Sequence, residues 1–246
     1  MKIYLAGFKL IENKISKAEY KDTLILSSFY EHKNGKYGDY VLHDKHILDS
    51  GAFSFLRGKK ADWDLYVDKY CSFIEKTKQN YFFELDIDSI IGLDKVEIIR
   101  DKIEQRIGKP TIPVWHKSRG IDYWYKLVEE YDYVAIGGLV SAGVSGKEYK
   151  YLRMMVDYAN KKGTKVHGLG FTKMDWLKKI KWYSVDSTTW LNAGRFGEYQ
   201  WFDGTKIKKR TAVGIGMKVR EDKKLEMLIH NFKEWNKFQK YAEENL

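Results

Sequence analysis

The stretches YVAIGG (133–138) and TKVHGLG (164–170), with the residues that join them, decide the fold. Both stretches are short, apolar and bounded by glycine, which is typical of buried β-strands. Between them, apolar residues recur at helical spacing, at Leu152, Met155, Val156 and Ala159. A strand, a helix and a second strand in this order predict a parallel βαβ unit, because parallel neighbours need a crossover connection.

The same pattern recurs along the chain. Six more apolar, β-rich runs are present, namely KIYLA (2–6), LILSS (24–28), HILDS (46–50), YFFELD (81–86), TIPVWH (111–116) and WYSVDS (182–187). Helical faces separate most of the later runs, and an amphipathic helix over about 223–243 closes the chain. This alternation favours an α/β fold, an irregular (β/α)8 TIM-type barrel, over an open sheet. The segment 199–216 is an alternative last strand, with residues 2–6 as an extra element.

The composition is that of an ordinary globular chain of 246 residues, 43% of them hydrophobic. We expect one domain over 1–246, because no linker or repeat divides the chain; two small domains are the alternative at this length. The single cysteine, Cys71, excludes a disulfide framework and a multi-cysteine zinc site. No apolar run is long enough to span a membrane, and the N-terminus resembles a strand rather than a signal peptide. We therefore expect a soluble, cytoplasmic protein.

The formal net charge of +10 indicates a polyanionic partner such as nucleic acid. Aromatic residues make up 15% of the chain, and aromatic rings stack on bases. A lysine-rich solvated surface over an aromatic core explains both numbers equally well.

Polar residues mark the carboxyl ends of the predicted strands. Asp49, Asp86 and Asp186 stand at three of these ends, and His116 and His167 at two others. In a parallel barrel these ends share one face, where catalytic groups gather. Taken singly, an aspartate after a strand usually caps the next helix, and a lone histidine is usually structural. Three aspartates on successive strand ends predict a shared site, because buried carboxylates need partners or a function.

Two other kinds of site have little support in the sequence. No metal-ligand spacing accompanies His116, so we expect no metal. Gly137 and Gly138 form either a plain turn or a place where a planar ligand approaches backbone N–H groups. No G-x-G-x-x-G follows the first strand, which argues against a dinucleotide-binding fold.

The ordered strand ends carry five motifs. They are Leu-Ser-Ser-Phe-Tyr (26–30), Asp-Ser-Gly-Ala-Phe (49–53), Ala-Ile-Gly-Gly-Leu (135–139), His-Gly-Leu-Gly (167–170) and Asp186 followed by Arg-Phe-Gly (195–197). Together they resemble the motifs of the tRNA-guanine transglycosylases (queuine tRNA-ribosyltransferases). Those enzymes are longer and carry a three-cysteine zinc site, which one cysteine cannot supply. The compact chain looks more like the phage DNA-guanine transglycosylases, which insert 7-deazaguanines such as preQ0 into DNA.

The resemblance implies a role for each matched residue. Asp186 would be the nucleophile that attacks C1′ of the target nucleotide, and Asp49 the general acid and base. Asp86, or Asp88 if the alignment slips, would read the N1–H and 2-amino edge of guanine. The remaining implied base contacts are Ser50, Phe53, Gly137, Gly138, Leu139, His167 and Gly168. Trp115 or His116 stands where the family has a base-contacting glutamine, and Ser54 also replaces a glutamine.

The implied reaction suits these residue types. Breaking an N-glycosidic bond builds positive charge on the sugar, which one carboxylate stabilises and traps, while a second acid protonates the departing purine. The target nucleotide must leave its stack to reach the pocket. A basic cluster would hold the nucleic-acid backbone, at Arg195, Lys206, Lys208, Lys209 and Arg210; a solvated loop is the alternative.

The resemblance therefore implies a pentosyltransferase that exchanges guanine in DNA for a 7-deazaguanine, without a cofactor. Its partners would be DNA, free guanine and the free 7-deazaguanine, with no membrane; a homodimer stays open. The alternatives are the same exchange on tRNA, a non-catalytic nucleic-acid-binding barrel, and a hydrolase that excises a modified base. If a phage encodes the chain, we expect it in the host cytoplasm.

Overall fold

The fold is described from a computed structural model, which covers residues 1–42, 45–51, 54–55, 61–138, 146–211 and 221–246. Its centre is a curled sheet of seven parallel strands in the order β3-β2-β1-β7-β6-β5-β4. The strands are β1 (Lys2–Ala6), β2 (Ile25–Ser28), β3 (His46–Asp49), β4 (Val114–Trp115), β5 (Tyr133–Ile136), β6 (Lys165–Gly168) and β7 (Ser184–Ser187). Each lies within a run predicted as a strand. The sheet is of the TIM-like α/β type.

The predicted run over 81–86 pairs more sparsely than the others. Phe82 forms an isolated parallel bridge with Leu48 of β3, and Phe83 forms one with Ile112, just before β4. The backbone N–H of Phe83 donates to the Leu48 carbonyl at 2.9 Å, and that of Ile112 donates to the Phe82 carbonyl at 2.8 Å. This segment thus contacts both edge strands of the seven-stranded sheet.

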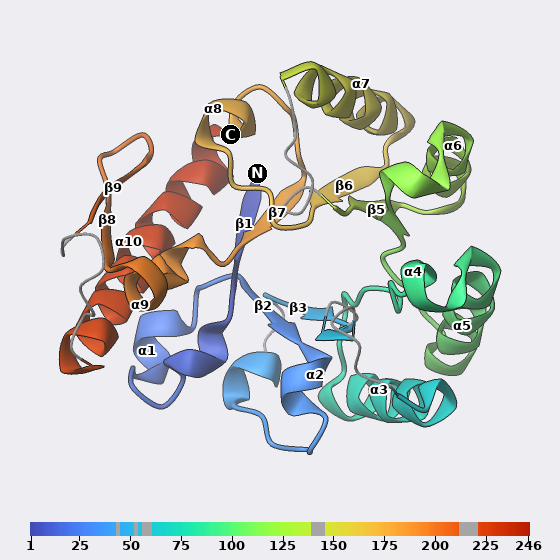
Figure 1. Ribbon diagram of the computed structural model, residues 1–246, viewed down its shortest axis with the longest axis horizontal. Helices are drawn as coiled ribbons and strands as arrows, with labels where there is room; N and C mark the ends of the chain where they lie inside the picture. The colour runs from blue at the N-terminus through green and yellow to red at the C-terminus, as the bar shows by residue number, and fades with distance from the viewer. Residues whose placement is uncertain (43–44, 52–53, 56–60, 139–145, 212–220) are drawn as a thin grey trace.

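Helices surround the sheet on its outer side (Figure 1). They are α1 (Lys17–Tyr20), α2 (Phe29–His32), α3 (Trp63–Thr77), α4 (Asp88–Ile91), α5 (Leu93–Ile107), α6 (Ile121–Glu130), α7 (Gly146–Lys162), α8 (Met174–Leu177), α9 (Asn192–Phe196) and α10 (Glu221–Asn245). The first two connections hold only short helices, as expected. None of the described helices combines the length and the hydropathy needed to cross a bilayer.

Strands and helices bury two layers of apolar side chains. Tyr4 and Ala6 of β1 face the inside of the curl with residues such as Phe83. Ile3 and Leu5 of the same strand pack outward against the helices. Because both faces of β1 are covered, its sequence is apolar on both faces rather than alternating.

The C-terminal part of the chain forms a hairpin and a long helix. β8 (Glu198–Phe202) and β9 (Ile207–Thr211) pair antiparallel in a separate sheet, so the alternative that took the last strand from 199–216 is wrong. The expected closing helix is α10, and it covers β1 and the start of β2. The Gln239 amide donates to the Leu24 carbonyl and accepts from the Leu24 N–H, each at 3.0 Å, and also donates to the Ile3 carbonyl.

Candidate active site

Three carboxyl groups converge at the carboxyl ends of the strands. Burial raises the pKa of Asp49, at the end of β3, to about 7, and the negative charges of Asp186 and Asp86 act in the same direction. The Gly51 N–H, 2.9 Å from Asp49 Oδ2, and the Ser28 hydroxyl oppose this shift. Asp186 at β7 and Asp86 after Phe83 are therefore near enough to Asp49 for their charges to act on it.

Gly51 keeps Asp49 in position. Its φ is +82°, a conformation that favours glycine. An added Cβ would lie 2.6 Å from Tyr30 Cβ and 2.8 Å from Ser28 Oγ. The close approach of β2 therefore leaves room only for a hydrogen atom at this position.

Asp186 lies in β7 and is almost fully buried, with 7% of its surface exposed. The N–H of Gly170 donates to its Oδ1 at 2.6 Å, and His167 Nε2 lies 3.2 Å from the same oxygen. Within the described residues, both of these hydrogen bonds go to Oδ1. This arrangement fixes the carboxylate while leaving Oδ2 for a substrate.

A buried chain of hydrogen bonds continues behind Asp186. His167 is fully buried, and its Nδ1 lies 2.6 Å from Ser184 Oγ, which in turn lies 2.6 Å from the Tyr133 hydroxyl. One set of protons satisfies the chain: His167 donates through Nε2 to Asp186, Ser184 donates to Nδ1, and Tyr133 donates to Ser184. The imidazole therefore contacts the proposed nucleophile directly.

A second cluster surrounds Asp86. Its Oδ2 lies 2.6 Å from His116 Nε2, and its Oδ1 accepts from Arg119 at 2.9 Å. Arg119 also donates to Asp88 at 3.0 Å and to Glu84 at 2.7 Å. Its side chain is only 1% exposed. One guanidinium thus holds three carboxylates in fixed directions.

Electrostatics in this cluster follow from those contacts. Burial raises the pKa of Glu84, and its two partners, Arg119 and Arg100, oppose the shift. Burial works against the charged form of His116, yet the hydrogen bond and charge of Asp86 raise its pKa. Asp88 is partly buried, but Arg119 lowers its pKa overall.

Asp86, Asp88 and His116 are the residues here that could bind a metal. Their ligand atoms lie within 4.8 Å of one another. Arg119 already donates to both carboxylates, so a positive charge is built into the cluster. The set therefore fits an ion-pair network better than a metal centre.

The His116 ring lies close to the glycines that follow β5. An added Cβ on Gly137 would lie 2.4 Å from His116 Cε1, and one on Gly138 would lie 3.3 Å from Nδ1. Gly138 has a φ of +76°. Glycine is needed at these two positions because a larger residue would displace the imidazole that contacts Asp86. This requirement holds whether or not a ligand also approaches the backbone.

The structure places the other predicted base contacts as follows. The Ser50 hydroxyl is buried and, within the described chain, has no hydrogen-bond partner. An added Cβ on Gly168 would contact Phe171 and Trp182, so this residue faces the helices. Trp115 is buried and donates to the Gly120 carbonyl at 2.6 Å. Phe53 and Leu139 lie outside the described residues.

The predicted backbone-binding cluster lies on the hairpin, at the outer edge of the molecule beside α10 (Figure 1). Lys208 pairs with Asp203 at 3.1 Å, and Lys209 pairs with Glu198 at 2.8 Å. Lys206 and Arg210 are exposed. The side chain of Arg195, in α9 after β7, lies outside the described part of the chain.

Sequence reasoning missed the residues that hold the site together. Arg119 follows β4 in the short helix η4 (Lys117–Arg119) and joins carboxylates more than 30 residues earlier in the chain. Ser184 and Gly170 likewise fix His167 and Asp186. The available signal was the pair Asp86 and Asp88, because two partly buried carboxylates so close together favour a cation nearby.

Comparison with known proteins gives one distant relative. The chain is 31% identical over 173 residues to "Uncharacterized protein 306" of Sulfolobus islandicus rod-shaped virus 1. The match covers 65% of this chain and 53% of the viral protein, so the chain spans about half the length of that relative. No protein-family model matches the sequence.

Proposed function

We propose that this protein is a guanine transglycosylase that replaces guanine in DNA with a 7-deazaguanine of the preQ0 type. One observation carries the proposal: Asp49 and Asp186 meet in one site in unlike environments. Asp49 has a pKa raised to about 7, largely by burial, whereas Asp186 accepts the Gly170 N–H. A carboxyl group that titrates near neutrality, beside a carboxylate held by a backbone N–H, suits base exchange on a sugar.

In the first half of the reaction, Asp186 Oδ2 attacks C1′ and the bond from C1′ to N9 of guanine breaks. The protonated Asp49 gives its proton to the departing guanine, so that guanine leaves neutral and Asp49 becomes a carboxylate. The sugar stays attached to Asp186 as an ester.

In the second half, the Asp49 carboxylate removes the N9 proton of the incoming 7-deazaguanine. N9 then attacks C1′, and the ester bond to Asp186 breaks. Both catalytic groups return to their starting forms, and no cofactor is consumed.

The base would be recognised beside this pair. Asp86 is held by His116 and Arg119, and its carboxylate would accept from the N1–H and 2-amino group of a purine. Asp88 is the alternative, since it accepts from Nε of Arg119, on the same edge of the guanidinium that donates to Asp86. Ser50 brings a hydroxyl without a partner in the described chain.

We further propose that the sheet is a complete (β/α)8 barrel, in which the segment around Phe82 and Phe83 is the fourth strand. The bridges to Leu48 and Ile112 support this view, because they join the two edges of the sheet. A barrel gathers all its strand ends around one mouth, as the proposed site requires.

A label-exchange experiment tests the proposal. Wild-type protein and Asp186→Ala would be incubated with radiolabelled guanine and either duplex DNA or unmodified tRNA, with Asp101→Asn, an exposed aspartate on α5, as the control variant. We expect label in DNA with the wild type and with Asp101→Asn, and none with Asp186→Ala. Label in tRNA alone would transfer the proposal to tRNA. Abasic sites without label would indicate a hydrolase. If neither labelled polymer nor abasic sites form, the proposal is wrong and the protein only binds nucleic acid.

A further inference from the structure

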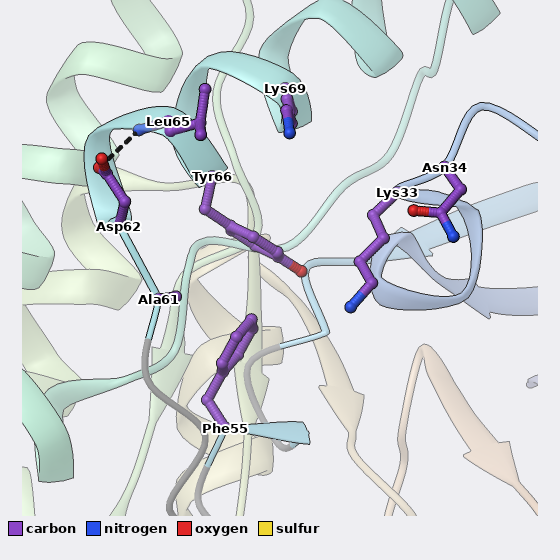
Figure 2. A pocket seen from close by; sticks show the side chains of 8 residues that line it. All are labelled: Lys33, Asn34, Phe55, Ala61, Asp62, Leu65, Tyr66 and Lys69. Carbon is purple, nitrogen blue, oxygen red and sulfur yellow. Dashed lines mark hydrogen bonds between the residues drawn. The ribbon is translucent and has the colours of Figure 1, made fainter.

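A pocket of about 310 Å³ lies next to the proposed catalytic residues. It is lined by Lys33, Asn34, Phe55, Ala61, Asp62, Leu65, Tyr66 and Lys69 (Figure 2). In this view Lys33, Phe55 and Tyr66 point toward the middle of the pocket, and Asn34 and Lys69 lie at its edge. None of these residues takes part in the chemistry proposed above. The volume is within the range of small-ligand sites.

The pocket shares a wall with the catalytic site. The Tyr66 hydroxyl donates to the carbonyl of Ser50 at 2.7 Å, immediately after Asp49. The Tyr30 ring, which crowds Gly51, lies 5.4 Å from the Phe55 ring. A ligand in this pocket would therefore be adjacent to the substrate of Asp49, and a polymer could occupy both places at once.

The lining combines aromatic and positive groups. Phe55 packs against Tyr66 and Trp63, each with ring centroids 5.0 Å away, which makes the inner wall rigid. Leu65 is 50% exposed and adds apolar surface at the rim. Phe55 and Tyr66 are only 6% and 7% exposed, so they form the floor of the pocket, and a base would contact this floor and Leu65.

Two lysines supply the charge that a phosphate needs. Lys33 Nζ lies 3.6 Å from the centre of the Tyr30 ring, which holds the amine at the pocket. Lys69 adds a second positive charge. The one carboxylate of the lining, Asp62, accepts from the Leu65 N–H as the cap of α3, and the pocket keeps a positive balance.

We infer that this pocket binds the nucleotide that directly neighbours the target guanine in a single-stranded or locally opened strand. The base lies against Phe55 and Leu65, and its phosphate contacts Lys33 and Lys69. This inference rests on the proposed function for its choice of polymer. It adds a second subsite, which fixes the strand while the target guanine is turned into the catalytic site.

A coupling experiment between pocket and oligonucleotide tests the inference. The protein would carry Asp186→Asn, and the probe would be a fluorescein-labelled single-stranded oligodeoxynucleotide with one guanine, compared with probes that lack the base on its 5′ or 3′ side. Removal of one of the two neighbouring bases should weaken binding by about fivefold or more, as measured by anisotropy. Phe55→Leu should abolish that difference, whereas Tyr151→Leu, which alters an exposed ring on α7, should preserve it.

The lysines give an independent arm, because they are exposed and their loss leaves the core intact. Replacing one phosphate beside the guanine by an uncharged methylphosphonate should weaken binding to the parent protein and to Lys150→Ala on α7. The same change should have little effect on a Lys33→Ala/Lys69→Ala protein. Equal penalties in all proteins, in both arms, would overturn the inference.

The experiments distinguish a failure of this inference from a failure of the proposed function. Base exchange without any coupling to Phe55 or the lysines would leave the transglycosylase and remove the subsite. Coupling without base exchange would leave a nucleotide-binding pocket on a protein of another activity.

Discussion

Asp49 shows how its position in the fold sets the protonation of a single side chain. Burial at the end of β3 raises its pKa to about 7, and the charges of Asp186 and Asp86 add to the shift. A carboxyl group that titrates near neutrality gives and takes a proton readily at physiological pH. The same residue can therefore protonate a leaving purine and deprotonate an entering one.

Replacing Asp49 by asparagine should abolish base exchange and yet stabilise the fold at alkaline pH. Because the folded-state pKa is raised from 3.8 to about 7, the carboxyl favours folding below about pH 4, and this contribution is lost as the pH rises through 7. At about pH 8 the variant should gain about 2–4 kcal/mol in the free energy of unfolding over the wild type, and little at about pH 4. Urea unfolding at both pH values measures this difference. Equal stability at the higher pH would contradict the buried charge.

At the scale of elements, the positions of the strands were predictable from the sequence, but the direction in which each side chain points was not. β5 is apolar on both faces because helices cover one side and the interior of the curl the other, and this pattern is visible in the sequence. The sequence could not show that the His167 side chain turns toward Asp186 and is fully buried, because that depends on which strand lies beside β6. The contacts of Arg119 were hidden for the same reason, since its partners come from another strand.

The turn after β3 depends on a glycine. Gly51→Ala should destabilise the protein by about 2–4 kcal/mol, because an added Cβ meets Tyr30 and Ser28 as well as an unfavourable φ. Gly35→Ala is the matched control: Gly35 has a φ of +76° but nothing within 4 Å of an added Cβ, so its loss should be about 1 kcal/mol. Denaturant unfolding of the two variants separates crowding from backbone strain, and equal losses would show that the crowding is relieved.

The cluster around Arg119 joins the segment after Phe83 to β4 and η4. Arg119→Lys should cost about 2–4 kcal/mol, because a single ammonium cannot reach Glu84, Asp86 and Asp88 together and charged hydrogen bonds are lost. The buried Glu84 keeps a second arginine as its partner. Arg106→Lys is the control, since Arg106 makes similar bidentate contacts with Glu75 at the surface and should tolerate the change. Thermal unfolding compares the two. A small loss for Arg119→Lys would mean that water reaches the cluster.

At the scale of the whole molecule, the first residue of the chain contacts the last helix beside β1. β1 lies between β2 and β7, and α10 covers it through Gln239. The terminal ammonium of Met1 donates to the carbonyl of Ala242 at 3.0 Å. The outer side of β1 is therefore covered only when the last helix is in place. The mouth that holds Asp49 and Asp186 thus depends on contacts made far along the chain.

The net charge of +10 does not say which cations bind nucleic acid, and variants of the hairpin test whether its basic residues do. If Lys206 and Arg210 contact phosphates, binding of duplex DNA should weaken with salt, and the double alanine variant should lower the slope of log K against log salt by about one to two units. A Lys150→Ala/Lys161→Ala protein removes the same charge from α7 and should keep the wild-type slope. Anisotropy titrations over a series of salt concentrations give both slopes. Equal slopes in the two double variants would show that the hairpin is solvated surface and that the DNA reaches the mouth by another path.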